Sequence, residues 1–279
     1  MNRVGRARFG QETLEIIDRG WYINPVGERI EIGKHVAACV ERTILYTPEG
    51  LAELNIEHKE SNEKTRYEVN NETTLEAAVR VAGEVKQEPV LALNFASAKN
   101  AGGGFLGGAQ AQEESLARSS ALYESLMSQP AYYERNRACG TCLYTDHMIL
   151  SPEVPVFRHD NGELRNEPYR VCILTAPAVN AGAIQRNETE KTNEIDRVMR
   201  RRMEYVLNVA LHHQYGTLIL GAWGCGVFRN DPDRIAELFS NLLLTDPRYR
   251  NQFRHVIFAV LDNDSEKIIG PFRERFGHR

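Results

Sequence analysis

The chain has 279 residues, 42% of them hydrophobic and 26% charged, with 34 basic and 38 acidic side chains and a net charge of −4. This composition fits a globular protein with a sizeable core, in one large or two small domains. The balanced charge excludes a protein held on nucleic acid or anionic lipid by its overall field, so direct DNA binding is not expected. No apolar run reaches the roughly 18 residues that span a bilayer. No apolar stretch follows the first residues, so we expect no membrane contact, no secretory signal and a cytoplasmic location.

The cysteines indicate neither a disulfide framework nor a metal site. The chain contains Cys39, Cys139, Cys142, Cys172 and Cys225. They are few and odd in number, which argues against paired disulfides. Cys139 and Cys142 form a single CxxC motif without the second pair that zinc needs, which favours two thiols on a surface loop. His212 and His213 are adjacent and point to different sides of a helix, so we expect no structural metal.

The first 87 residues predict a mixed α/β segment. Alternation, turn residues and capping residues indicate four features here. They are a helix over 11–18, a hairpin of strands 21–23 and 29–32 around the turn 24–28, a strand over 65–69, and a helix that begins at Thr73 or Thr74.

From residue 88 onward, apolar strands alternate with amphipathic helices. The predicted strands are 89–95, 169–175, 217–220 and 255–260, and the predicted helices are 112–127, 191–212, one capped by Asp231 with Pro232 in its first turn, and 265–276. This alternation indicates an α/β layer fold with a mixed, largely parallel sheet. Ligands in such sheets bind outside the carboxyl ends of the strands. Two glycine-rich loops follow such ends, which is the first indication of a binding site.

The first glycine-rich loop runs from Asn100 to Glu114 and contains Gly102, Gly103 and Gly104. It formally satisfies GxGxxG, but Gly102 lies seven residues after Phe95 and the next helix is expected only near residue 112. A dinucleotide motif needs its first glycine directly after the strand and its helix inside the motif, so we reject that interpretation. Glycines instead let backbone amides approach a ligand closely. A flexible surface loop remains the alternative.

The second loop, residues 221–230, contains Gly224, Cys225 and Gly226, followed by Val227 and Phe228. It precedes the predicted helix at Asp231, so amides and the helix dipole together would favour a phosphate. Two such loops at neighbouring strand ends suit a diphosphate. Phe228 offers a surface on which a ribose or a base can pack, although a single phenylalanine is more often a core residue.

Two adjacent carboxylates, Glu113 and Glu114, follow the first loop. Acidic residues are common in the first turn of a helix, where they complement its dipole. Here they also face the predicted diphosphate pocket, where like charge and desolvation favour a protonated carboxyl and the helix dipole opposes it. A protonated carboxyl at this place is a candidate general acid for a glycosidic oxygen.

Three glycines, seven further residues and Gln112-Glu113-Glu114 after an apolar strand resemble the signature of the poly(ADP-ribose) glycohydrolases. The length and the late Gly-Cys-Gly-Val-Phe segment resemble the compact bacterial-type members. The resemblance implies a macrodomain-like three-layer α/β fold with a mixed, largely parallel sheet. It also implies an N-terminal mixed α/β extension, residues 1–87, packed on a catalytic core, residues 88–279, in one continuous globular unit.

The resemblance also implies residue roles. Glu114 would be the catalytic acid and base, and Glu113 would hold the ribose hydroxyls. The residues implied to bind ADP-ribose are Asn100, Gly102, Gly103, Gly104, Gln112, Gly224, Cys225, Gly226, Val227 and Phe228. No metal or cofactor is implied. The implied partners are poly(ADP-ribose) or ADP-ribose, with ADP-ribosylated proteins as further candidates.

Other interpretations stay open at this point. A macrodomain that binds ADP-ribose without cleaving it is the first alternative, and the glutamate pair speaks against it. An enzyme acting on a free ADP-ribose derivative is the second, and a structural protein is the third. Arg197, Arg200, Arg201 and Arg202 favour a solvated helix face over contact with a polyanion. Asp262 and Asn263 are candidates for contacting adenine.

Overall fold

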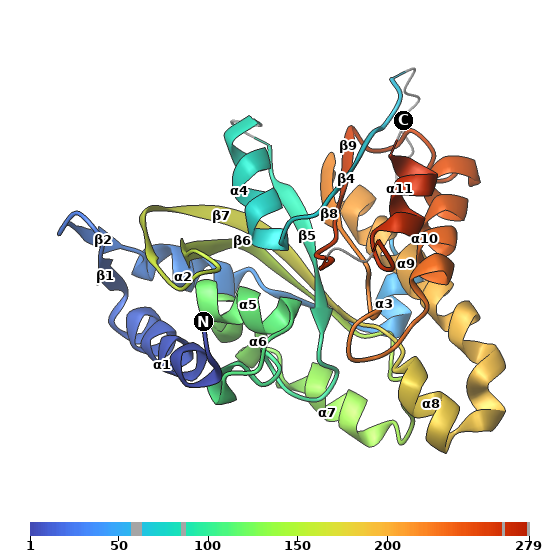
Figure 1. The fold of residues 1–279 in the computed structure, drawn as a ribbon, viewed down its shortest axis with the longest axis horizontal. Coiled ribbons are helices and arrows are strands. Elements are labelled where there is room, and N and C mark those ends of the chain that lie inside the picture. Colours follow the sequence, from blue (N-terminus) through green and yellow to red (C-terminus); the bar gives the residue numbers. More distant parts are fainter. Residues whose placement is uncertain (57–62, 85–87, 264–265, 278–279) are drawn as a thin grey trace.

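The structure is a computed structural model that describes residues 1–56, 63–84, 88–263 and 266–277. Its centre is a seven-stranded sheet in the order β3-β6-β7-β5-β8-β9-β4, with a separate hairpin of β1 and β2 (Figure 1). The strands are β1 (Trp21–Ile23), β2 (Arg29–Glu31), β3 (Ile44–Tyr46), β4 (Arg66–Asn70), β5 (Val90–Ala96), β6 (Met148–Arg158), β7 (Leu164–Pro177), β8 (Thr217–Leu220) and β9 (His255–Ala259). The α-helices are α1 (Arg3–Arg19), α2 (Gly33–Glu41), α3 (Pro48–Ala52), α4 (Thr74–Glu84), α5 (Gln112–Ser119), α6 (Leu122–Met127), α7 (Pro130–Ala138), α8 (Ala181–Asn187), α9 (Ile195–His212), α10 (Pro232–Ser240) and α11 (Gly270–Phe276).

The predicted largely parallel sheet is confirmed. β5 pairs in parallel with β7 and with β8, β8 with β9, and β9 with β4. β6 is antiparallel to β7, and β3 is antiparallel to β6. The predicted hairpin is also present as β1 and β2. The parallel strands therefore bring their carboxyl ends to one edge of the sheet.

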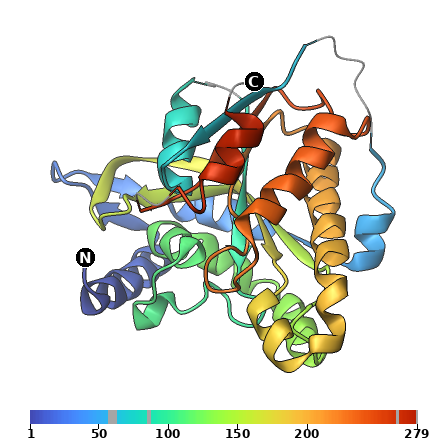
Figure 2. The same cartoon turned by 45° about the vertical axis from the view of Figure 1, so that its right-hand side comes forward.

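Helices cover both faces of the sheet, which makes three layers. In β5, Leu91 and Leu93 join the cluster with helices α9, α10 and α11, whereas Val90 and Ala92 join the cluster with α4, α5 and α6. Successive side chains of a strand point to opposite faces, so an apolar strand buried on both sides is expected. Figure 2 shows α9 and α10 side by side on one face of the sheet.

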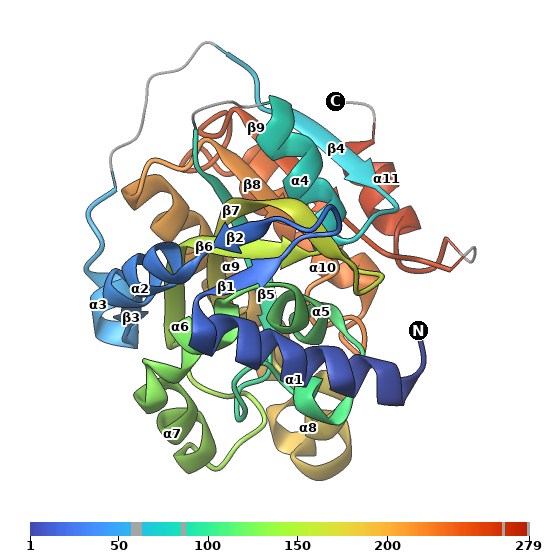
Figure 3. The ribbon, with the colours of Figure 1, turned by 90° about the vertical axis from the view of Figure 1, so that its left-hand side faces the viewer.

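The N-terminal segment supplies both edge strands of the sheet, β3 and β4. It also supplies α1, which crosses over α5 (Figure 3), where the Thr13 hydroxyl donates to the carbonyl of Arg118 at 2.5 Å. The sheet therefore runs across the predicted division between residues 1–87 and 88–279. Residue 87 lies outside the described residues, and the division into an N-terminal extension and a core within one continuous unit stays a prediction.

One predicted helix, 112–127, is wrong because it is two helices, α5 and α6. Between them Ser120 is extended, with φ −148° and ψ 176°. Ser120 forms a bridge with Val156, and the Ala121 amide donates to the carbonyl of Pro155 at 3.1 Å. Pairing with β6 breaks the helix, which helical periodicity does not reveal.

Strand β6 has no counterpart among the predicted elements. It contains Pro152 and Pro155, and proline within a run argues against a strand. The structure accommodates them through register shifts between Ser151 and Val154 and between Val156 and Arg158. Glu153 adopts φ 48° in the first of these. The missed strand is thus a bulged one, although its main partner is β7, the next strand along the chain.

Strand β3 and helices α2, α3, α7 and α8 also have no counterpart among the predicted elements. The other elements differ from their predictions mainly in extent. α1 is longer than the predicted helix, a 3-10 segment precedes α9, and α11 begins at Gly270 rather than at residue 265, which lies outside the described residues. The cysteines are free, with Cys139 and Cys142 half-buried. In the described part of the chain no helix is long and apolar enough to cross a membrane, and no group of three or more His, Cys, Asp or Glu side chains could hold a metal ion.

The core on the α10–α11 side depends on Phe258, whose ring lies 4.4 Å from Phe276 and 5.2 Å from Phe272 between centroids. It is fully buried. We expect Phe258→Ala to lower the free energy of unfolding by about 3–5 kcal/mol, measured by urea denaturation. Val26→Ala, at a 67% exposed turn residue, should change it by less than about 0.5 kcal/mol. A loss below about 1 kcal/mol for Phe258→Ala would contradict this account of the core.

Candidate active site

A cavity of about 830 Å³ lies at the carboxyl ends of the parallel strands. Its lining includes Ser97 after β5, Ala178 after β7, Ala222 after β8, Val260 after β9 and Thr73 after β4. The volume is in the range of small-molecule sites. The prediction that a ligand site lies at this edge of the sheet therefore has a matching cavity.

Most of the predicted site residues line this cavity. They are Asn100, Gly103, Gly104, Gln112, Glu113, Glu114, Gly224, Cys225, Gly226, Val227 and Phe228. Gly102 does not, because it is buried beneath the loop, where an added Cβ would meet the ring of Phe105 at 2.9 Å. Gly102 and Gly103 adopt φ values of 65° and 58°, which side chains disfavour. Gly102 therefore shapes the loop from below.

Glu113 is 3% exposed at the start of α5. Its Oε2 accepts from the Ser97 amide at 2.7 Å, and its Oε1 accepts from Asn94 Nδ2 at 3.3 Å. Asn94 in turn donates to the Thr175 hydroxyl of β7 at 3.1 Å. Burial raises the pKa of Glu113 from 4.5 to about 8, although these hydrogen bonds oppose the rise. Glu113 is thus a buried carboxyl, anchored to two strands and neutral at pH 7.

Glu114 faces the cavity and is half-buried. Its Oε1 accepts from the Gly104 amide at 3.0 Å, which ties the carboxylate to the glycine loop. A Cβ on Gly103 would collide with the same oxygen. Only a glycine at residue 103 therefore leaves room for the carboxylate at this place.

Gln112 is fully engaged with the protein. Its Oε1 accepts from the Phe95 amide at 2.8 Å, and its Nε2 donates to the Leu93 carbonyl at 2.7 Å and to the Thr74 hydroxyl at 3.1 Å. The side chain binds the end of β5 as a neighbouring strand would. Gln112 therefore holds the start of α5 against β5, and its amide has little capacity left for a ligand.

The second glycine loop is held by Asn230, whose Nδ2 donates to the carbonyls of Val179 at 2.8 Å and Gly224 at 3.1 Å. Gly224 has φ 77°, and a Cβ there would meet Asn230 and Ala178. Burial raises the pKa of the Cys225 thiol, which favours its uncharged form. Neither Asp231 nor the first turn of α10 lines the cavity, so the predicted contribution of that helix end is not supported.

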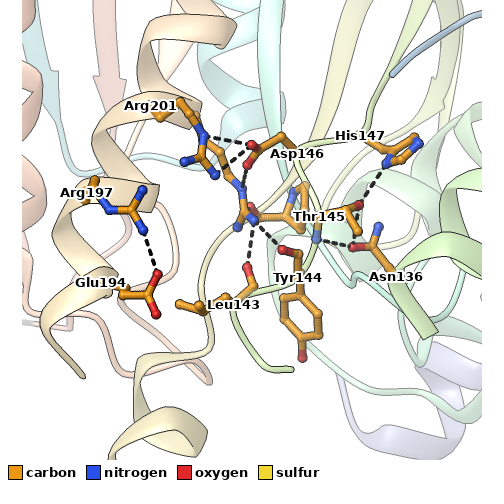
Figure 4. Close-up of polar contacts among 11 residues, drawn as sticks. Asn136, Leu143, Tyr144, Thr145, Asp146, His147, Glu194, Arg197 and Arg201 are labelled. Atoms are coloured by element: carbon orange, nitrogen blue, oxygen red, sulfur yellow. Dashed lines mark hydrogen bonds and ion pairs between the residues drawn. The ribbon is translucent and has the colours of Figure 1, made fainter. Parts of the chain in front are cut away.

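Phe228 is half-buried and packs against Tyr144, with ring centroids 6.0 Å apart. Tyr144 has φ 61° and lies on the loop of Leu143 to His147 that Figure 4 labels. The guanidinium of Arg202 holds this loop. Arg202 Nη2 donates to the Leu143 and Tyr144 carbonyls at 2.6 and 3.0 Å. Its Nε donates to Asp146 at 2.9 Å. The surface offered by Phe228 therefore depends on a buried arginine of α9.

The arginines of α9 do not form one solvated face. Arg202 is fully buried, which corrects that interpretation. The other three form ion pairs: Arg201 with Asp146, Arg197 with Glu194, and Arg200 with Glu204 (Figure 4 shows the first two). Helical spacing did not reveal the burial, because the loop that covers Arg202 is remote in sequence.

Several cavity residues were absent from the predicted site. Asp160, in the turn between β6 and β7, accepts from the Thr73 hydroxyl at 2.7 Å and the Ser115 hydroxyl at 2.6 Å. All three line the cavity. Because β6 was not predicted, the sequence analysis did not place this turn next to α5.

The two candidates for contacting adenine differ in position. Asn263 lines the cavity, whereas Asp262 does not. Asp262 is 6% exposed, and its Oδ2 accepts from the Ile268 amide at 2.8 Å and the Ile269 amide at 3.1 Å. The Asp262 carboxylate therefore supports the segment before α11, and Asn263 remains as a candidate ligand residue.

The glycine loop and the glutamate pair both lie within a region that matches a known family. Residues 10–159 match the family described as the microbial-type PARG catalytic domain, where PARG denotes poly(ADP-ribose) glycohydrolase. The match covers more than half of the chain. The chain belongs to this family. No curated protein gives a significant match.

Solved structures of bacterial PARG proteins are similar along almost the whole chain. PARG from Thermomonospora curvata is 48% identical, with a TM-score of 0.93 over 98% of this chain and 99% of that one. The same protein bound to the inhibitor ADP-HPD has a TM-score of 0.90 over the same shares. PARG from Deinococcus radiodurans in complex with ADP-ribose is 45% identical, with a TM-score of 0.80 over 87% of this chain and 96% of that one. This chain and these solved structures therefore share the macrodomain-like fold.

In this PARG the N-terminal helix also reaches the glycine loop. Arg3 Nε donates to the Gly107 carbonyl and Arg6 Nε to the Gly108 carbonyl, each at 2.9 Å. A Cβ on Gly108 would collide with the Arg3 carbonyl. Helix α1 therefore supports the glycine loop at Gly107 and Gly108.

The buried carboxyl of Glu113 predicts a specific pH dependence of stability. Its pKa rises from 4.5 to about 8 on folding, so the folded protein holds one more proton than the unfolded chain between these values. The contribution is fully present below about pH 4.5 and is lost as the pH rises through about 8. In urea denaturation from pH 5 to 8.5, the unsubstituted protein should lose stability more steeply than the Glu113→Gln variant, whose side chain at this position cannot ionise. Parallel pH profiles for the two proteins would contradict the buried neutral carboxyl.

Gly103→Ala tests the contact between the glycine loop and Glu114. The added Cβ meets the end of a flexible side chain, so the carboxylate should move while the fold persists. We expect release of ADP-ribose from poly(ADP-ribose) to fall at least about tenfold, with about 1–3 kcal/mol of backbone strain. Gly50→Ala, where the nearest atom lies at 3.6 Å in an ordinary helix, should keep full activity. Unchanged turnover by Gly103→Ala would show that the position of Glu114 is not critical.

Proposed function

We propose that this PARG releases ADP-ribose by hydrolysing ribose–ribose O-glycosidic bonds of poly(ADP-ribose), with Glu114 as general acid and base. The observation that carries the proposal is the pair of glutamates at the edge of an 830 Å³ cavity, one anchored and one facing the cavity. ADP-ribose is the expected ligand and product. ADP-ribosylated proteins and a cytoplasmic location are further expectations.

Glu114 rather than Glu113 is suited to proton transfer. Both oxygens of Glu113 already accept hydrogen bonds from the protein, and the side chain is almost fully buried. Glu114 is half-buried and lines the cavity, and among the described residues its carboxylate accepts one hydrogen bond, from the Gly104 amide to Oε1. A general acid must come within hydrogen-bond distance of the oxygen that it protonates.

The reaction needs one carboxyl that acts twice. Glu114 gives its proton to the leaving ribose oxygen as the C–O bond breaks, which leaves a positively charged oxocarbenium ion. Water then adds to the anomeric carbon and gives a proton back to Glu114, which restores the starting carboxyl. The diphosphate of the substrate stabilises the cation electrostatically, so a second carboxylate nucleophile is less necessary than in ordinary glycosidases.

The other cavity residues hold the substrate in this proposal. Glu113 orients the ribose hydroxyls from its fixed position, and Asn100 contacts the same sugar. The amides of the two glycine loops, at Gly103 and Gly104 and at residues 224–226, receive the diphosphate. Phe228, supported by Tyr144, packs against the second ribose. These assignments rest on which side chains and amides line one cavity.

Glu114→Gln is the decisive variant, because it removes the transferable proton and preserves the volume. We expect release of ADP-ribose from purified poly(ADP-ribose) to fall by a factor of about 10²–10⁴, the usual contribution of a general acid. Affinity for ADP-ribose, measured by calorimetry, should stay within a few-fold of the wild type. Glu41→Gln, at an exposed residue near the end of α2, is the matched control and should release ADP-ribose normally.

Two outcomes would overturn the proposal. Normal turnover by Glu114→Gln would remove Glu114 from the mechanism while leaving the activity in place. No release by the wild type, with ADP-ribose still bound, would instead favour a non-catalytic ADP-ribose-binding module, the alternative function. The calorimetric measurement separates this second case from a misfolded preparation.

A further inference from the structure

A second cavity, of about 470 Å³, lies between the glycine loop and the helices α6 and α7. It shares Asn100, Gly103 and Gly104 with the active-site cavity. Its other walls come from α6 and α7, which lie together below the sheet in Figure 1. The two cavities therefore meet at the glycine loop, where the Gly104 amide holds Glu114 at 3.0 Å.

The walls of this second cavity are aromatic. Tyr123 of α6 is half-buried and packs on the buried Phe105, with ring centroids 5.1 Å apart. Tyr133 of α7 also lines the cavity and is 4% exposed. Phe105 lines the cavity as well, so three aromatic side chains form part of its wall.

The charge at this cavity is positive. Among the described residues that line it, Arg137 of α7 alone carries a charge, and its side chain is exposed. Arg137 Nη1 donates to the Lys99 carbonyl at 2.5 Å, and a guanidinium has further N–H groups besides this one. A guanidinium presents paired N–H groups to phosphate oxygens. The cavity thus combines an aromatic surface and a cation.

The proposed reaction requires a place for the group that leaves. When Glu114 protonates the leaving oxygen, that oxygen belongs to the ribose of the preceding ADP-ribose unit, which carries adenine and a diphosphate. Bases stack on aromatic side chains, and diphosphates pair with arginine. The second cavity offers both on the far side of the loop that holds Glu114.

We propose that the cavity formed by the glycine loop, α6 and α7 binds the preceding nucleotide unit of the polymer, on the leaving side of the scissile bond. Its adenine lies against Tyr123, and its diphosphate lies at Arg137. The inference rests on the proposed role of Glu114. In this proposal α6 and α7 contact a nucleotide that is present in the polymer and absent when free ADP-ribose binds.

The test compares turnover of a dimer of ADP-ribose with binding of ADP-ribose alone. For Tyr123→Ser and Arg137→Ala, kcat/KM on the dimer should fall roughly tenfold or more, as loss of base stacking or of a phosphate contact does. The Kd for ADP-ribose in the active-site cavity should stay within about twofold, a free-energy change below about 0.5 kcal/mol. Tyr123→Phe, which keeps the ring, should restore turnover. Arg135→Gln, at an exposed arginine of α7 outside the cavity lining, is the matched control.

Each contrary outcome is distinct. Full turnover of the dimer by both Tyr123→Ser and Arg137→Ala would overturn the proposal. An equal loss of dimer turnover and ADP-ribose affinity would also overturn it, because these side chains would then act by supporting the glycine loop. If the wild type does not cleave the dimer at all, the proposed function fails instead, whatever the variants do.

Discussion

The burial of Glu113 at the end of β5 is the constraint on which the site depends. Its carboxyl receives the Ser97 amide and Asn94, so the first turn of α5 is held to two adjacent strands. Placing a carboxyl there raises its pKa to about 8, an electrostatic cost that hydrogen bonds offset in part. This burial fixes the orientation of the first turn of α5. Because Glu113 is turned inward, Glu114 is turned toward the glycine loop and the cavity.

The supports around this centre come from remote parts of the chain. Gln112 binds the backbone of β5. Arg3 and Arg6 of α1 donate to backbone carbonyls at the end of the glycine loop that precedes α5. On the opposite wall, Arg202 holds the loop that carries Tyr144 against Phe228. Preorganised groups cost little reorganisation during a reaction. Helices α1 and α9 thus act on the site without lining its cavity.

In the proposed polymer complex, α6 and α7 add a second binding region next to the one for the terminal ADP-ribose unit. The active-site cavity and the cavity beside Tyr123 and Arg137 share Asn100, Gly103 and Gly104 of the glycine loop. A polymer substrate has an ADP-ribose unit on each side of the bond that breaks. The loop that holds the acid is therefore also the place where the two units meet.

Local patterns were enough to predict β5, β8, the cap at Asp231, both glycine loops and Glu113 with Glu114, because each depends on residues close in sequence. The grouping of these loops at one edge also followed, since parallel strands align their carboxyl ends. The break at Ser120, the approach of Asp160 to α5 and the burial of Arg202 depend instead on contacts between segments remote in sequence. Strand β6 pairs with its neighbour β7, but its prolines and register shifts hide the pattern that marks a strand. Which glutamate is buried was likewise decided by packing, because two adjacent residues of a helix have the same local chemistry and only the sheet beside them makes one side of the helix the inside.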